Sequence, residues 1–187
     1  MRSIILTTAL ALLVFARAHA APLQTLTLIP SNGTVAGQAG MVVGWGYDIT
    51  NTDPNDWVLL EDSYVAGDLS SGLYGSYVDY ISLNAFVIDP SSSTGPVAFS
   101  QGISGVGEFD ISQFAPITTI TGEINIDYAI YSGGDPTTDP NAVFIGPGLL
   151  TASAQVDVVP EPSAIVMMTG AALLALSVVW RRKARHS

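Results

Sequence analysis

Alternation of apolar and polar residues dominates the middle of the chain, from about residue 23 to residue 158. Between residues 41 and 50 every second position is a large apolar residue, namely Val43, Trp45, Tyr47 and Ile49. A period of two places such side chains on one face of a β-strand. The same kind of pattern predicts further strands at residues 23–29, 57–60, 77–88, 97–99, 107–111, 117–131 and 149–158.

Short turn sequences rich in Gly, Pro, Asn, Asp and Ser separate these predicted strands, as at residues 30–33 and 91–96. No stretch before residue 163 combines a 3.6-residue period with capping residues, so no helix is expected there. Seven to nine strands in roughly 135 residues are typical of an immunoglobulin-like antiparallel β-sandwich. Trp45 is the expected anchor of its core. The expected core side of strand 117–131 is Ile120, Ile124, Ile126, Tyr128 and Ile130.

The first apolar run, at the N-terminus, has the three parts of a secretory signal peptide. Arg2 is the positive start, residues 4–15 are continuously apolar, and Ala18 and Ala20 form a small-x-small cleavage site. Residues 1–20 are therefore predicted to be removed by signal peptidase after Ala20. A permanent membrane helix is disfavoured because the run is too short to cross a bilayer.

The second apolar run lies near the C-terminus and follows a short proline motif, Pro160-Glu161-Pro162. Residues 164–180 carry no charge, and at about 1.5 Å per residue they approach the length that a membrane-spanning helix needs. A basic stop follows at residues 181–185, made of Arg181, Arg182, Lys183 and Arg185. Because basic residues stay on the cytoplasmic side, the domain before the helix is predicted to face outward.

The Val-Pro-Glu-Pro-Ser sequence, the apolar segment and the terminal Arg cluster together resemble the PEP-CTERM sorting signal of Gram-negative bacteria. The resemblance implies recognition by an exosortase, a membrane-embedded cysteine protease that processes the tail during export. It also implies an association with exopolysaccharide and biofilm. The protein is then expected to cross the inner membrane, to be held there transiently, and to end in the cell envelope or extracellular matrix. The alternative is a plain single-pass membrane anchor, in which the prolines only break the linker before the helix.

Three segments follow from these patterns: a signal peptide (1–20), an acidic ectodomain (21–158) and a sorting tail (159–187). All six Lys and Arg residues lie in the first and last segments, and the interval from residue 22 to residue 180 contains all sixteen carboxylates and no Lys, Arg or His. Such a polyanionic domain repels phosphate backbones, so nucleic-acid binding is excluded. The chain has no cysteine, which excludes disulfides, thiolate metal sites and cysteine nucleophiles.

The ectodomain also lacks the residues that most enzymes use. Without His, Cys, Lys or Arg it has no catalytic triad, Schiff-base lysine or histidine-ligated zinc. Paired carboxylates remain, which suffice for a glycosidase, but strand alternation places each pair on a solvated face. We therefore expect no enzymatic activity and no cofactor. The three pairs are Glu61–Asp62, Glu108–Asp110 and Glu123–Asp127.

Two binding roles stay open beside a purely structural role in the extracellular matrix. Calcium prefers oxygen ligands, and residues 51–56 and 135–141 supply them, although neither loop has the spacing of a known calcium motif. Aromatic faces stack on sugars, so the domain is alternatively a carbohydrate-binding module. The aromatic candidates are Trp57, Tyr64, Tyr74, Tyr77 and Tyr80, of which the cluster at 74–80 is favoured.

Overall fold

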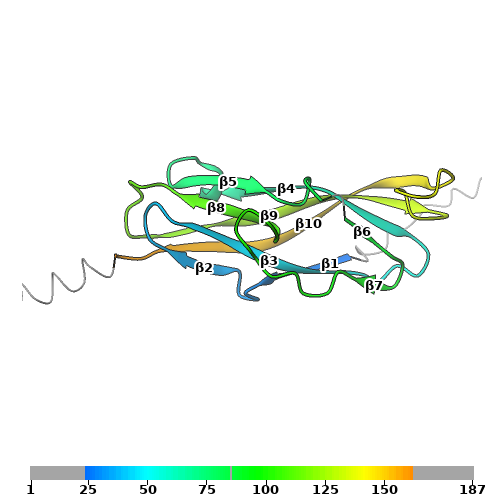
Figure 1. The fold of residues 1–187 in the computed structure, drawn as a ribbon, viewed down its shortest axis with the longest axis horizontal. Helices are drawn as coiled ribbons and strands as arrows, with labels where there is room; N and C mark the ends of the chain where they lie inside the picture. Colours follow the sequence, from blue (N-terminus) through cyan, green and yellow to red (C-terminus); the bar gives the residue numbers. More distant parts are fainter. Residues whose placement is uncertain (1–23, 85, 162–187) are drawn as a thin grey trace, which may run out of the picture.

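The computed structural model describes residues 24–84 and 86–161, which form an all-β sandwich of two five-stranded sheets (Figure 1). One sheet has the order β1 (Gln24–Ile29), β3 (Val42–Asn51), β8 (Gly107–Ile111) and β5 (Gly75–Asp79), with β7 (Ser92–Ser93) paired to β3. The other has the order β2 (Thr34–Gly37), β10 (Val143–Val158), β9 (Thr119–Ser132), β4 (Trp57–Gly67) and β6 (Val87–Ile88). A single 3-10 turn, η1 (Asp68–Ser70), follows β4.

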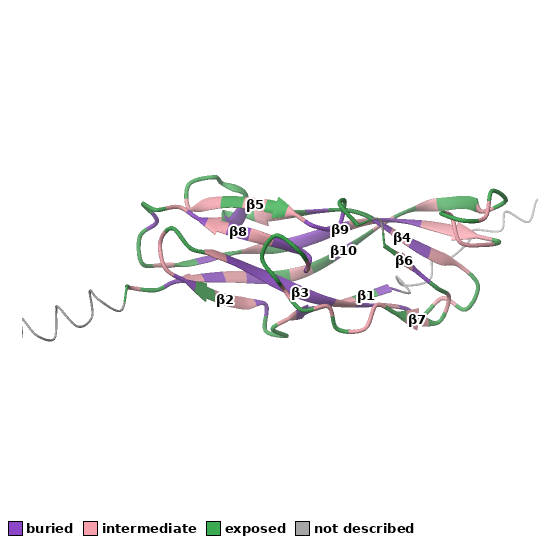
Figure 2. Ribbon diagram, in the orientation of Figure 1, coloured by how far each residue is buried: buried purple, intermediate pink, exposed green. Residues whose placement is uncertain are grey.

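The core lies between the sheets, with the buried residues along the middle of the strands and the exposed ones in the end loops (Figure 2). Trp45 is fully buried, as expected for the core anchor, and its indole Nε1 donates to the carbonyl oxygen of Gly33 at 2.7 Å. A buried indole N–H needs such a partner because an unpaired donor inside the core is costly. This bond ties β3 of one sheet to the turn before β2 of the other.

Several predicted strands are confirmed, with corrected ends. The strand at 41–50 is β3, and all four of its alternating residues are buried. The strand at 117–131 is β9, with Ile120, Ile124, Ile126 and Tyr128 buried and Ile130 partly buried against the core. The strands at 57–60 and 149–158 are segments of the longer β4 and β10.

Two predicted strands are wrong. Residues 77–88 do not form one strand: β5 ends at Asp79, and β6 belongs to the opposite sheet. The carboxylate of Asp79 accepts hydrogen bonds from the backbone N–H groups of Ile81 and Ser82, which turns the chain between the sheets. Residues 97–99 form only an isolated bridge, Tyr47 to Val97. The pairing is also not wholly antiparallel, because β2 and β10 run parallel.

The hairpin of β9 and β10 runs the length of the molecule and defines two ends (Figure 1). We call the end where the chain leaves the sheet the exit pole; it consists of loops 38–41, 71–74 and 112–118 with residues 159–161. The distal pole, at the other end, consists of loops 52–56, 89–91 and 133–142. The predicted signal peptide, the helix at 164–180 and the basic stop lie outside the described residues. Within the described part of the chain, no helix has the length and apolar character to span a membrane.

Candidate functional site

A row of three aromatic side chains crosses the outer surface of the β4–β9–β10 sheet next to the distal pole. Trp57 of β4 is in register with Tyr131 of β9, which is in register with Phe144 of β10. The Tyr131 and Phe144 rings contact each other edge to face, with centroids 5.7 Å apart and planes at 67°. Their neighbours Val58 and Ile130 point into the core, so by alternation the row points outward.

More apolar residues continue this row along β10. Pro147 and Leu149 alternate onto the same outer surface, and Phe144 and Leu149 keep about half of their surface exposed (55% and 50%). We call this set, Trp57, Tyr131, Phe144, Pro147 and Leu149, the aromatic face. Exposed apolar residues gathered on one surface mark a contact site more often than scattered ones do.

Carboxylates border the aromatic face on the side towards the middle of the sheet. Asp62 and Asp127 are directly opposite each other, and Asp127 is opposite Leu149. The pKa of Asp62 is raised, first by desolvation, then by a hydrogen bond with Asp79 and by the negative charges of Asp79 and Asp127. Burial opposes ionisation of Asp79, but hydrogen bonds from Ser63, Ser82 and Ile81 outweigh it and lower the pKa of that carboxyl. The border is therefore a group of mutually repelling acids without a cation among the described residues.

The two acidic loops proposed for calcium both lie at the distal pole. Their carboxylates are already occupied by donors of their own loops. Asp53 accepts from the backbone N–H groups of Asn55 and Asp56, at 2.8 and 3.0 Å. Asp135 accepts from Thr137, which lowers the pKa of its carboxyl, and Asp139 accepts from Asn141. Within residues 24–84 and 86–161, no three acidic or His side chains come together as a metal site would require.

Of the aromatic residues proposed for sugar stacking, the structure exposes only two. Trp57 belongs to the aromatic face, and Tyr64 lies further along β4 with 40% of its surface exposed. The favoured cluster at 74–80 was the wrong choice, because its side chains fill the interior. Tyr77 bonds Ser63 Oγ at 2.8 Å, and burial raises the pKa of its hydroxyl; Tyr80 is 4% exposed and donates to Glu108.

The remaining sequence candidates are dispersed. Glu61 and Asp62 flank an irregularity in the pairing of β4 with β9, and Glu108 is bonded by Tyr80. Glu123 and Asp127 lie four residues apart on one strand. Pro160 and Glu161 emerge at the exit pole, whereas Pro162 lies outside the described residues. Sequence reasoning missed Tyr131 and Phe144, and the signal that finds them is hairpin register, since both flank the 133–142 loop.

Comparisons with known proteins support the fold class and nothing finer. No family model matches this chain, and no curated protein matches it. Among solved structures, the chain is similar to PapD-like domain 7 of human CEP192, with a TM-score of 0.32 and 12% identity, over 83% of this chain and 99% of that one. It is also similar to a chain of the CaDoc0917–CaCohA2 complex, with a TM-score of 0.31 and 14% identity, over 73% and 99%. A further similarity is to a type I cohesin–dockerin complex of Clostridium thermocellum, with a TM-score of 0.28 and 11% identity, over 73% and 99%.

Proposed function

We propose that this protein is an exported, non-enzymatic surface protein whose immunoglobulin-like ectodomain is delivered by a PEP-CTERM-type tail. The observation that carries the proposal is the course of the β9–β10 hairpin. Its tip holds the aromatic face at the distal pole, and its last strand ends at the exit pole (Figure 1). The sorting motif and the most exposed aromatic surface therefore lie at opposite ends of one rigid hairpin, an arrangement suited to display.

The position of the motif relative to the sheet also supports this role. The backbone N–H of Val159 donates to the Gly37 carbonyl oxygen at 2.9 Å, which is the last contact of the β2–β10 edge. Pro160 follows and has no N–H to continue the pairing. The Pro-Glu-Pro motif thus begins where the folded domain ends, in an extended backbone that a protease cleft can bind.

The test is the intact mass of the protein recovered from cells that contain an exosortase. We expect the wild type to lack the tail beyond the motif, and a Pro160→Ala/Pro162→Ala double variant to retain it. Pro116→Ala, an exposed proline at the same pole outside the motif, is the matched control and should be processed normally. If the wild type keeps residues 164–185 in the presence of the exosortase, the tail is a plain single-pass anchor and the proposal fails.

The aromatic face favours a second role for the same displayed domain, recognition of a carbohydrate such as an exopolysaccharide. Stacking of a sugar on an exposed ring requires no cation or cofactor. Binding of the ectodomain to a glycan array tests this role, with Phe144→Ser as the variant and Phe114→Ser, at the opposite pole, as the control. Loss of signal in the first variant alone supports recognition by the face. A silent array for the wild type leaves the purely structural matrix role.

A further inference from the structure

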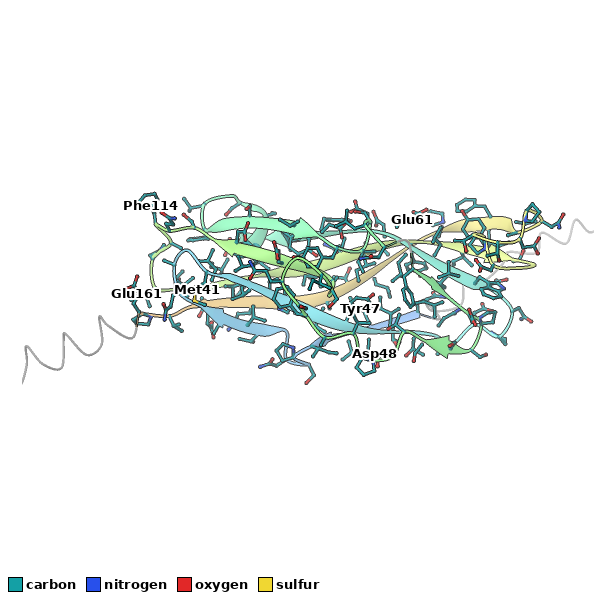
Figure 3. The ribbon with its side chains drawn as sticks, viewed as in Figure 1. Met41, Tyr47, Asp48, Glu61, Phe114 and Glu161 are labelled. Carbon is teal, nitrogen blue, oxygen red and sulfur yellow. The ribbon has the colours of Figure 1, made fainter. Side chains whose placement is uncertain are left out.

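The exit pole carries exposed apolar side chains on three separate loops. Leu73, Phe114 and Ile117 keep 70%, 92% and 68% of their surface exposed, and Met41 is about half exposed. Figure 3 shows Met41 and Phe114 grouped with Glu161 at the end where the chain leaves the domain. Single exposed apolar residues are ordinary, but their concentration around the chain exit requires an explanation.

Backbone hydrogen bonds hold these loops together as one surface. Loop 38–41 is fixed to β8 by a bond from Gly40 N to Ile111 O at 3.0 Å. Loops 71–74 and 112–118 are joined by a bond from Ser112 N to Tyr74 O at 2.8 Å. The last strand joins them through a bond from Val158 N to Thr118 O, also at 2.8 Å. The apolar side chains therefore project from a pre-ordered platform that surrounds the exit of the tail.

Charge separates this platform from the rest of the domain. Loops 38–41, 71–74 and 112–118 contain no Asp, Glu, Lys, Arg or His, although the ectodomain is a polyanion. The nearest carboxylates are Glu161 in the exiting segment and Asp68, Asp110 and Asp157 on adjoining elements. The loops at the distal pole, in contrast, contain Asp53, Asp56, Asp89, Asp135 and Asp139. Only the exit pole thus presents loops that anionic lipid headgroups do not repel.

The length of the chain brings a membrane close to this pole. Glu161 is the last described residue, and the apolar segment of the predicted tail begins at residue 164. Three residue steps cover at most about 11 Å, even when fully extended. The headgroup region of a bilayer is several ångströms deep on each side of the hydrocarbon core. A tail inserted in a membrane therefore leaves the exit pole at the level of the headgroups.

From this geometry we propose that the exit pole is a lipid-contacting surface, which rests on the headgroup region of the bilayer that holds the tail. Phe114, Leu73 and Ile117 enter that region, as apolar side chains do in proteins that lie at a membrane interface. The contact holds the sandwich upright, with the aromatic face turned away from the membrane. The inference depends on the proposed function only in needing an inserted tail.

The test uses the mature chain, residues 21–187, reconstituted in vesicles of phosphatidylethanolamine and phosphatidylglycerol. Because the protein has no cysteine, Gln113→Cys beside Phe114 gives a single site for an environment-sensitive fluorophore. Asn141→Cys, an exposed site at the distal pole, is the matched control. With lipids spin-labelled at the headgroup, we expect at least twofold quenching at the first site and none at the second. Adding Leu73→Ser, Phe114→Ser and Ile117→Ser should bring the first site to the control level.

Flotation of the same vesicles separates the possible failures. Protein that does not float with lipid has no inserted tail, which overturns this inference and the proposed anchoring together. Protein that floats with an unquenched site at 113 overturns the inference alone. Quenching that survives the triple serine change also overturns it, because the tether by itself then explains the proximity. A site that becomes shielded only when an exosortase shares the membrane shows a protein-docking surface in place of a lipid contact.

Discussion

The sharpest stability prediction concerns Asn51, the last residue of β3, which is fully buried at the distal pole. Its Nδ2 donates to the carbonyl oxygens of Asp56 at 2.8 Å and Asp89 at 3.1 Å. Its Oδ1 accepts from the backbone N–H of Asp53 at 3.1 Å and from Gln24 Nε2 at 3.3 Å. This single amide therefore joins the β3–β4 loop, the loop after β6 and the start of β1.

An Asn51→Asp variant keeps the shape of the side chain and removes both of its donors. Two carbonyl oxygens then face a carboxylate. An unsatisfied buried polar group costs about 1–3 kcal/mol. Because the Asn51 bonds to Asp56 and Asp89 are only partly buried, we take the lower half of that range and expect a loss of about 2–4 kcal/mol at pH 7. That is a large fraction of the total stability of an ordinary domain, about 5–15 kcal/mol.

The loss should depend on pH in a definite direction. Burial and the facing carbonyl oxygens raise the folded-state pKa of the new carboxyl above its unfolded value of about 3.9. Its protonated form is uncharged and regains one donor. The stability deficit is therefore smallest below the unfolded pKa and grows as the pH rises through the folded pKa.

The assay is urea unfolding followed by tryptophan fluorescence, since Trp45 is buried in the folded core. Asn55→Asp is the control, because it adds the same charge at an exposed position of the neighbouring loop. If Asn51→Asp loses no more stability than Asn55→Asp at pH 7, the hydrogen-bonding argument is wrong. A deficit that grows as the pH falls would refute the argument from burial.

Three further predictions can be checked with the same equipment. Asp62→Asn should raise the urea midpoint at pH 7 and change it little below pH 4, because the raised pKa of Asp62 means that its ionised form is disfavoured in the fold, first by desolvation and then by Asp79; a fall at pH 7 contradicts this. Gly148→Ala should cost about 1–3 kcal/mol, since the new Cβ would lie 2.1 Å from the Tyr128 ring, whereas Gly146→Ala, with nothing within 4 Å, should be nearly neutral. About 1 mM calcium should leave the thermal midpoint unchanged, because the loop carboxylates are already bonded; a site occupied at a hundred times its dissociation constant would add about 2.7 kcal/mol and disprove this.

The sequence was most informative where burial and period coincide. In β3 the apolar residues at every second position all face the core, so alternation alone located the strand and its inward face. It failed between residues 77 and 88, where Tyr80 and Ile81 are buried although they lie in a turn. Their apolar character reflects the space between the sheets that they fill, and period-based reasoning reads that as strand.

The extent of β10 was hidden for a different reason. Gly146, Pro147 and Gly148 are typical of a turn, yet they lie within the strand. Along this stretch β10 is an edge, since β2 pairs only with residues 155–158, and a proline at an edge leaves no ladder bond unmade. Edge position depends on the whole topology. The same lack of information kept Phe144 and Tyr131 from being joined to Trp57 in one aromatic row.

The long β9–β10 hairpin has a mechanical consequence for a domain held at its C-terminus. A pull on Glu161 acts along β10, which is paired with β9 from residue 143 to residue 157 and with β2 at residues 155–158. A ligand held at the aromatic face would pull on the other end of the same hairpin. The two forces would load the ladder in shear, where many hydrogen bonds resist together and none can break singly. Since forced unfolding is governed by the unfolding rate, the lifetime of such a link under flow would be set by the slowest rupture the sandwich offers.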